Sequence, residues 1–138
     1  MKLFLDDTRI PRDVGYQDAE WTIVRDYATF KVILDNFGPE EISFDHDLAD
    51  FSKNQGIEKE WTGLDCAKYL VERDSKWNMI TPDFKWKVHS YNPVGKKNIE
   101  EYLKCYIKFK LDNKERKWYN ESLIWIGRCI ESTQVKQR

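Results

Sequence analysis

The stretch Lys2-Leu3-Phe4-Leu5-Asp6-Asp7 is a short apolar run that ends abruptly in two aspartates. A run of this kind, bounded by polar residues, is typical of a buried strand. The pattern recurs at residues 41–44, which lead into Asp45-His46-Asp47, and at residues 84–88, which lead into His89-Ser90. The sequence therefore predicts three strands that each end in titratable or hydroxyl side chains.

Segments with helical spacing separate most of the predicted strands. Residues 21–24 form a further β-rich run, and apolar residues then recur at helical intervals over 27–37, before Gly38-Pro39. Thr62 is a suitable N-cap for a helix over 63–75, and another helix is expected from about residue 97. The order strand, strand, helix, strand, helix, strand, helix predicts an α/β fold with a largely parallel sheet flanked by helices.

Three stretches carry weaker signals. Residues 8–20 have poor helix signals, so the first crossover is predicted either as a helix or as a loop. Residues 48–61 are predicted to be a polar loop. Residues 110–114 are a candidate hairpin turn, and Leu123 to Ile126 are a candidate final strand or short helix.

The composition limits the class of protein. A chain of 138 residues, of which 41% are hydrophobic, fits one domain with a single core. We place that domain at 1–131, with a C-terminal extension over 108–131 and a polar tail over 132–138. The formal net charge of −1 argues against bulk binding to DNA, which needs a clear basic excess.

The cysteines and the chain start bear on the compartment. Cys66, Cys105 and Cys129 are far apart and lack CxxC spacing, so we expect neither a disulfide framework nor a zinc knuckle. The first residues become acidic too soon for a signal peptide, and no apolar run approaches the roughly 20 residues of a membrane span. A cytoplasmic protein without a membrane partner is expected.

Titratable residues gather at the ends of the three predicted strands, where open α/β sheets bind their ligands. We expect them to converge in one solvent-accessible cleft. We predict His46, His89 and Asp45 as catalytic residues and Asp6, Asp7 and Asp45 as metal ligands. The predicted substrate-binding residues are Arg9, Asp47, Ser90, Asn92 and Gly95.

Each of these features also has a simpler interpretation. Two aspartates after a strand are typical of a turn or a helix cap. Asp45-His46-Asp47 can begin a loop, His89 can be a core histidine with a hydrogen-bond partner, and residues 92–95 can form a plain turn. Their conjunction at one sheet edge favours a site over separate structural roles.

The residue types fit phosphate chemistry. Clustered carboxylates repel one another, and Mg²⁺ or Mn²⁺ relieves that repulsion through oxygen ligands. The cation can then bind phosphate oxygens, while Arg9 pairs with the same anion. His46 and His89 titrate near neutral pH, so one can take a proton while the other gives one. Ser90, Asn92 and the amides around Gly95 are suitable donors to phosphate.

Four segments resemble the cyclic-phosphate processing receiver family. They are residues 2–11, residues 42–48, Thr62-Gly63 with Asp65, and residues 88–95 with Asn98, in order over residues 1 to about 107. The combination of Asp-His-Asp-Leu with His-Ser-x-Asn-Pro-Val-Gly is specific, whereas either motif alone is weak. The resemblance implies a receiver-like, flavodoxin-like fold and a role on cyclic phosphates in RNA repair or conflict systems of bacteria and phages.

The resemblance also implies roles for single residues. Asp6 and Asp7 match the acidic pair that binds Mg²⁺ in receivers, Asp45 matches the phosphoacceptor, and Ser90 matches the hydroxyl after the fourth strand. His46 and His89 separate this family from ordinary receivers. The lysine that ends the fifth strand of an ordinary receiver has no assignable counterpart here, which argues against aspartyl-phosphate signalling.

Three functions fit these observations. The first is a phosphoesterase that opens or removes a cyclic phosphate, at an RNA end or in a cyclic nucleotide. The second is a module that binds a phosphorylated ligand without turnover, and the third is an interaction domain that switches a protein partner. The two histidines favour the first over the third, and the sequence does not separate the first from the second.

Overall fold

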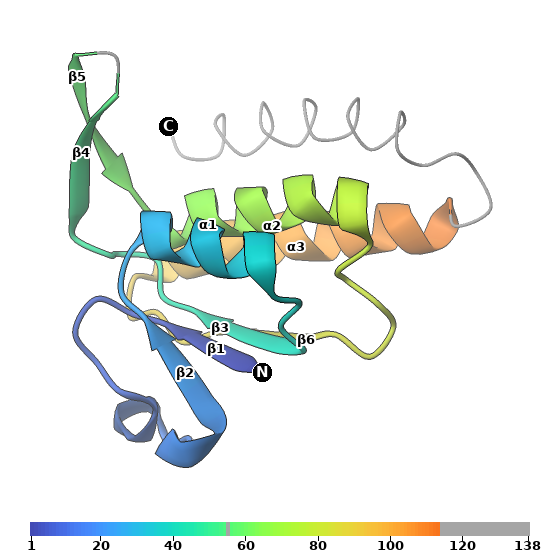
Figure 1. Ribbon diagram of the computed structural model, residues 1–138, viewed down its shortest axis with the longest axis horizontal. Coiled ribbons are helices and arrows are strands. Elements are labelled where there is room, and N and C mark those ends of the chain that lie inside the picture. The colour runs from blue at the N-terminus through green and yellow to red at the C-terminus, as the bar shows by residue number, and fades with distance from the viewer. Residues whose placement is uncertain (55, 114–138) are drawn as a thin grey trace.

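The centre of the fold is a sheet of four parallel strands, seen in a computed structural model that describes residues 1–54 and 56–113 (Figure 1). The strands lie in the order β2 (Trp21–Val24), β1 (Lys2–Leu5), β3 (Glu41–Phe44) and β6 (Lys85–Val88). Their last residues pair directly, because Leu5 lies opposite Val24 and Phe44, and Phe44 lies opposite Val88. This register places the residues that follow each strand at one common edge.

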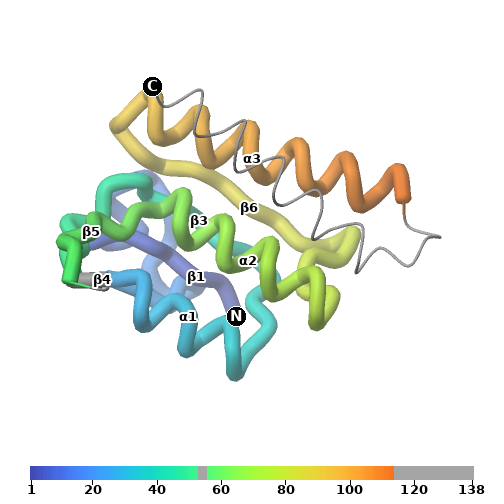
Figure 2. Tube along the Cα trace, turned by 90° about the horizontal axis from the view of Figure 1, so that it is seen from above, coloured from blue at the N-terminus to red at the C-terminus, as the bar shows by residue number. Residues whose placement is uncertain are grey.

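Three helices cover one face of this sheet, as both views show (Figures 1 and 2). They are α1 (Tyr27–Asn36), α2 (Gly63–Trp77) and α3 (Pro93–Asp112). Each begins with a side chain that accepts a hydrogen bond from a backbone amide of the first turn: Asp26 from Thr29, Thr62 from Asp65 and Asn92 from Gly95. Because the helices follow strands of a parallel sheet, α2 and α3 both begin near the edge where the strands end.

The hydrophobic core fills the space between the sheet and the helices. Leu3, Leu5, Ile42 and Phe44 point to the helical face of the sheet and are fully buried. They pack against buried side chains of the three helices, among them Phe30, Leu34, Leu70, Val71, Ile99, Leu103 and Tyr106. The alternation of strand side chains leaves Phe4 and Ser43 on the opposite face.

The opposite face is covered by the first crossover rather than by an α-helix. Residues 8–20 contain two short 3₁₀ helices, η1 (Pro11–Val14) and η2 (Asp18–Glu20). Tyr16 from this segment stacks on Trp21, with ring centroids 5.1 Å apart, and both rings meet Phe4 edge-on. Of the two alternatives for this crossover, a helix or a loop, the structure has a loop with two 3₁₀ turns and no regular α-helix.

Two predicted elements differ from the structure. The polar loop expected over 48–61 is an antiparallel hairpin of β4 (Asp50–Asn54) and β5 (Ile57–Trp61). Helix α3 begins at Pro93 rather than near residue 97, because proline is well suited to the first position of a helix. The same helix runs through Lys110 to Asp112, so the hairpin turn expected there is wrong for those residues.

The predicted fold class is confirmed: a largely parallel sheet flanked by helices, of the receiver-like α/β type. Within residues 1–54 and 56–113, none of the helices combines the length and the apolar character that crossing a membrane requires. The candidate strand or helix at Leu123 to Ile126 and the polar tail over 132–138 lie outside the described residues.

Candidate functional site

Asp6 is the most heavily hydrogen-bonded side chain at the carboxyl edge of the sheet. Its Oδ1 accepts from the backbone amides of Thr8 and Arg9, at 3.0 and 2.8 Å. Its Oδ2 lies 2.8 Å from Nε of Arg9 and 3.0 Å from Nε2 of His89. Burial raises the pKa of Asp6, but these hydrogen bonds and the charge of Arg9 outweigh it, so the pKa lies below its ordinary value.

Arg9 joins this aspartate to a second one. Its Nη2 lies 3.4 Å from Oδ1 of Asp45 and donates to the carbonyl of His89, while the guanidinium covers the ring of Tyr91 at 4.5 Å. Nη1 is buried and lacks a hydrogen-bond acceptor among the described residues. Arg9 therefore neutralises two carboxylates and keeps one donor that is not satisfied within that part of the chain.

The carboxylates of Asp6, Asp7 and Asp45 come together as predicted, with one oxygen of each within 4.8 Å of the others. Burial, followed by the charge of Asp6, raises the pKa of Asp45 to about 6, although Arg9, Ser90 and the His46 amide act in the opposite direction. Asp7 is partly exposed and makes no hydrogen bond or ion pair within the described residues.

These carboxylates fit a hard divalent cation in ligand type and spacing. The three carboxylates are not equally available as ligands for such a cation. Asp6 already uses both oxygens for four donors. Asp45 has fewer: Oδ1 accepts from the His46 amide and lies near Arg9, and the carboxylate is also hydrogen-bonded by Ser90. Asp7 and Asp45 would therefore hold such an ion, in competition with Arg9 for the negative charge.

His89 lies beneath this acidic centre, and its side chain is only 3% exposed. The ring stacks on Phe4 at 4.4 Å, and Nδ1 lies 2.7 Å from Oγ of Ser43, which also contacts the hydroxyl of Tyr16. A carboxylate only accepts hydrogen bonds, so Nε2 carries the proton toward Asp6 and Nδ1 accepts from Ser43. Burial lowers the pKa of His89, which favours this neutral form. The expectation that His89 lines a solvent-accessible cleft is wrong.

His46 occupies a different environment. Its Nδ1 lies 2.9 Å from Oδ1 of Asp47, and Asn92 donates from Nδ2 to both oxygens of Asp47, at 3.3 and 3.2 Å. The other amide atom of Asn92, Oδ1, accepts from the backbone amide of Gly95. Nε2 of His46 has no hydrogen-bond partner among the described residues. One ring nitrogen is thus held in place while the other remains available.

Glycines allow this arrangement at two points. A β-carbon at Gly95 would overlap the ring of His46, and one at Gly63 would overlap the backbone carbonyl of Asp45. The amide of Gly63 also donates to the carbonyl of His46, at 2.8 Å. The start of α2 therefore packs directly on the backbone of residues 45–46, and the start of α3 packs on the imidazole.

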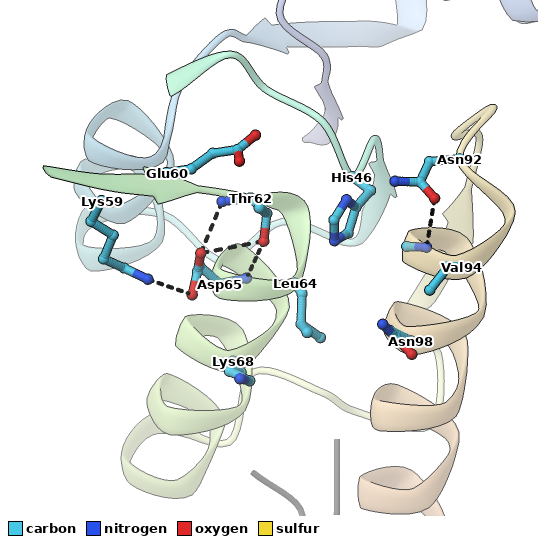
Figure 3. Close-up of a pocket in the computed structure, with 11 residues that line it drawn as sticks. His46, Lys59, Glu60, Thr62, Leu64, Asp65, Lys68, Asn92, Val94 and Asn98 are labelled. Carbon is cyan, nitrogen blue, oxygen red and sulfur yellow. Dashed lines mark hydrogen bonds and ion pairs between the residues drawn. The ribbon is translucent and has the colours of Figure 1, made fainter. Parts of the chain in front are cut away.

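His46 faces a cleft of about 350 Å³ between the first turns of α2 and α3 (Figure 3). We call it the helix-end cleft. Its lining combines residues of β5, of both helices, of their N-caps and of the loop after β3: His46, Lys59, Glu60, Thr62, Leu64, Asp65, Lys68, Asn92, Val94, Gly95 and Asn98.

The predicted site residues thus form two neighbouring groups. Asp6, Asp7, Arg9, Asp45 and His89 make up the acidic centre. His46, Asn92 and Gly95 line the helix-end cleft, and Asp47 holds His46 without being part of that lining. The two groups are neighbours because Asp45, in the acidic centre, and His46, in the cleft, are consecutive residues. No hydrogen bond or ring contact links His46 to His89 within the described residues.

Ser90 and Gly95 were predicted to bind substrate, and both already make contacts within the protein. Oγ of Ser90 accepts from the amide of Asn92 at 3.1 Å and lies at the acidic centre beside Asp45. The Gly95 amide is used by Asn92, so its place beneath the imidazole is the more important feature.

Sequence reasoning did not single out Ser43, Tyr16, Lys59 or Lys68. Ser43 could have been noticed as a polar residue inside a buried strand, whereas the other three carry no local signal.

Comparison with known proteins identifies the family. The family model of the cyclic-phosphate processing receiver domain matches residues 1–105, a range that contains the acidic centre and the whole lining of the helix-end cleft. Searches of curated proteins and of solved structures found no match. The family description couples a receiver domain to cyclic-phosphate processing, and so implies a phosphate-containing ligand. On this match, which covers most of its length, the chain belongs to the cyclic-phosphate processing receiver domain family.

Proposed function

We propose that this chain is a phosphoesterase that opens a cyclic phosphate, at an RNA end or in a small cyclic nucleotide. One observation carries the proposal: His46 is held at Nδ1 by Asp47 while Nε2 has no partner within the described residues, in a cleft beside an acidic centre. An imidazole held in this way is suited to proton transfer at its other nitrogen.

His46 would act as the general base. Asp47 accepts the proton of Nδ1, so the lone pair of a neutral ring is on Nε2. A water molecule attacks phosphorus and gives its proton to Nε2, while the bond from phosphorus to one ring oxygen breaks. The product is an acyclic phosphate monoester if the substrate is a nucleoside cyclic monophosphate.

The leaving oxygen must receive a proton, and Asp45 is the best-placed donor that the acidic centre offers. Its pKa of about 6 leaves part of the carboxyl protonated near neutral pH. One of the two histidines was expected to give this proton, but the ring of His89 is buried and both of its nitrogens are engaged. We therefore assign His89 a positioning role, through its hydrogen bond to Asp6.

The phosphate itself would be held by donors around the acidic centre. Nη1 of Arg9 lacks an acceptor among the described residues, and a phosphate oxygen would satisfy it after a small shift of the side chain. Ser90 lies beside Asp45 and can donate its hydroxyl proton. A divalent cation held by Asp7 and Asp45 would neutralise further phosphate charge when bound. Because such an ion would keep Asp45 ionised, the role of Asp45 as proton donor applies to the protein without the ion.

A module that binds a phosphate ester without turnover is the second candidate. The burial of His89 favours it, because the site then offers one accessible imidazole rather than a pair. Arg9 and Ser90 could hold an anion equally well without any proton transfer.

Turnover separates the two candidates. We would incubate the protein with nucleoside 2′,3′-cyclic and 3′,5′-cyclic monophosphates, with EDTA or with Mg²⁺, and measure the monoester formed. Binding would be measured in parallel by calorimetry. An esterase should lose turnover but keep binding in His46→Ala. Saturable binding with no product under any of these conditions would instead establish the binding module.

A further inference from the structure

The helix-end cleft contains the side-chain amide of a buried residue, Asn98, which has no hydrogen-bond partner among the described residues. Asn98, in the second turn of α3, is only 6% exposed and lines the cleft, where Figure 3 shows it extending from α3 toward α2. Its side chain makes no hydrogen bond with any residue in 1–54 or 56–113. Neither polar atom of this amide belongs to the fully buried unpartnered atoms, so both stay accessible from the cleft and can donate to or accept from a ligand there.

A second polar group of the same cleft, the ammonium of Lys68, has no ion-pair partner in the part of the chain that the structure describes. Lys68, in the second turn of α2, is half-buried and forms no ion pair or hydrogen bond within the described residues. Burial lowers its pKa, with Asp65 acting against this effect and Lys59 adding to it. An anion in the cleft would compensate the charge of a lysine held in this environment.

The remaining lining also suits an anion. The first turns of α2 and α3 border the cleft, and helix starts favour negative charge. Of the two carboxylates there, Asp65 accepts from the amide of Thr62 and pairs with Lys59 at 3.6 Å. Glu60 belongs to the exposed strand β5 and can turn toward solvent.

Asn98 and Lys68 each lie about one helical turn beyond a residue of the first turn that lines the cleft. Asn98 is three residues beyond Gly95, on which the ring of His46 lies, and Lys68 is four residues beyond Leu64. Three or four residues are about one helical turn, roughly 5.4 Å along the axis. An anion held by both side chains would thus be about one turn away from the imidazole.

We propose that Lys68 and Asn98 form a second phosphate subsite, which holds a phosphate group of the substrate other than the cyclic one. The proposal rests on the proposed function and narrows its substrate class to nucleotides that carry both a 2′,3′-cyclic phosphate and a 5′-phosphate. Lys68 supplies the charge, and the Asn98 amide donates to a phosphate oxygen.

The first test uses inorganic phosphate and the side-chain amide resonance of Asn98 in ¹⁵N-labelled protein. Phosphate should shift this resonance, and Lys68→Met should weaken the apparent affinity by roughly tenfold. Lys76→Met is the matched control, because Lys76 is exposed on the last turn of the same helix. An unmoved resonance, or equal weakening by both variants, would overturn the subsite.

The second test compares turnover of a nucleoside 2′,3′-cyclic monophosphate with and without a 5′-phosphate. The 5′-phosphorylated substrate should have a kcat/KM roughly tenfold higher, and Lys68→Met and Asn98→Asp should each remove that preference while Lys76→Met keeps it. Equal turnover of both substrates would overturn the substrate class. A phosphate-induced shift at Asn98 in a protein that turns over neither substrate would support the subsite and contradict the esterase.

Discussion

The imidazole of His46 lies directly on the α-carbon of Gly95, so closely that a side chain at position 95 would overlap the ring. The same ring is held by Asp47, and Asp47 is held by Asn92, the residue that caps α3. The start of one helix therefore determines where the proposed base lies.

Gly95→Ala should separate activity from folding. Alanine favours a helix over glycine by about 1 kcal/mol, so thermal stability should change little. The new methyl group should displace the imidazole from Asp47 and lower kcat/KM by roughly tenfold or more. Gly38→Ala is the control, since a β-carbon there meets nothing within 4 Å. Full activity in a folded Gly95→Ala protein would show that the position of the ring does not matter.

The two histidines should respond differently to removal. His46→Ala should lower turnover by roughly 10²-fold and leave the fold intact, because the ring borders a cleft. His89→Ala removes a buried ring with two hydrogen bonds and should cost roughly 2–4 kcal/mol of unfolding free energy. Urea unfolding measured beside turnover checks both variants. A His89→Ala protein as stable as the wild type would contradict the buried role.

Asp45→Asn should stabilise the protein in a pH-dependent way. The pKa of Asp45 in the folded state, about 6, lies above its ordinary value, so the folded state binds this proton more tightly than the unfolded state. The wild-type protein therefore loses stability as pH rises from about 4 through 6. Asparagine at position 45 does not ionise, so the variant does not lose this contribution.

The advantage of the variant should be small at pH 4 and on the order of 2 kcal/mol at pH 8, measured by urea unfolding in EDTA. An advantage of the same size at both pH values would mean that Asp45 titrates normally.

Mg²⁺ or Mn²⁺ should raise the melting temperature modestly, because a ligand that binds only the folded state stabilises it. Asp7→Asn should abolish the rise, and it is a cleaner test than Asp6→Asn, since Asp6 also holds Arg9 and His89. Asp83→Asn changes an exposed carboxylate elsewhere and should leave the effect unchanged. A wild-type melting temperature that ignores both cations would contradict the metal proposal.

The parallel sheet could be predicted because its strands are apolar runs bounded by polar residues, as in residues 2–7. The hairpin could not, since none of its side chains whose burial is described is buried: Phe51 and Ile57 are 59% and 72% exposed. Without a buried side, the alternation that reveals a strand is absent. Asn92-Pro93 was interpreted as a turn, whereas Asn92 caps α3 and Pro93 opens it.

The grouping of Asp6, Asp7 and Asp45 could also be predicted, because it follows from the register of a parallel sheet alone. The environment of His89 could not. It depends on Phe4, Ser43 and Tyr16, which come from three separate segments and meet only on the face without α-helices. That Lys68 and Asn98 line one cleft and lack a partner within residues 1–54 and 56–113 likewise becomes visible only when two helices are placed side by side.

The hairpin of β4 and β5 pairs with no other strand in the described part of the chain, and its base is tied to α1. There Asp50 accepts from the amide of Tyr27, and Trp61 stacks on the Tyr27 ring at 4.3 Å. Its ladder should therefore exchange amide hydrogens for deuterium much faster than the central sheet. Lys59 and Glu60 belong to this ladder and line the helix-end cleft. One wall of the cleft can therefore open locally, while the wall formed by α3, which carries Asn98, stays protected from hydrogen exchange.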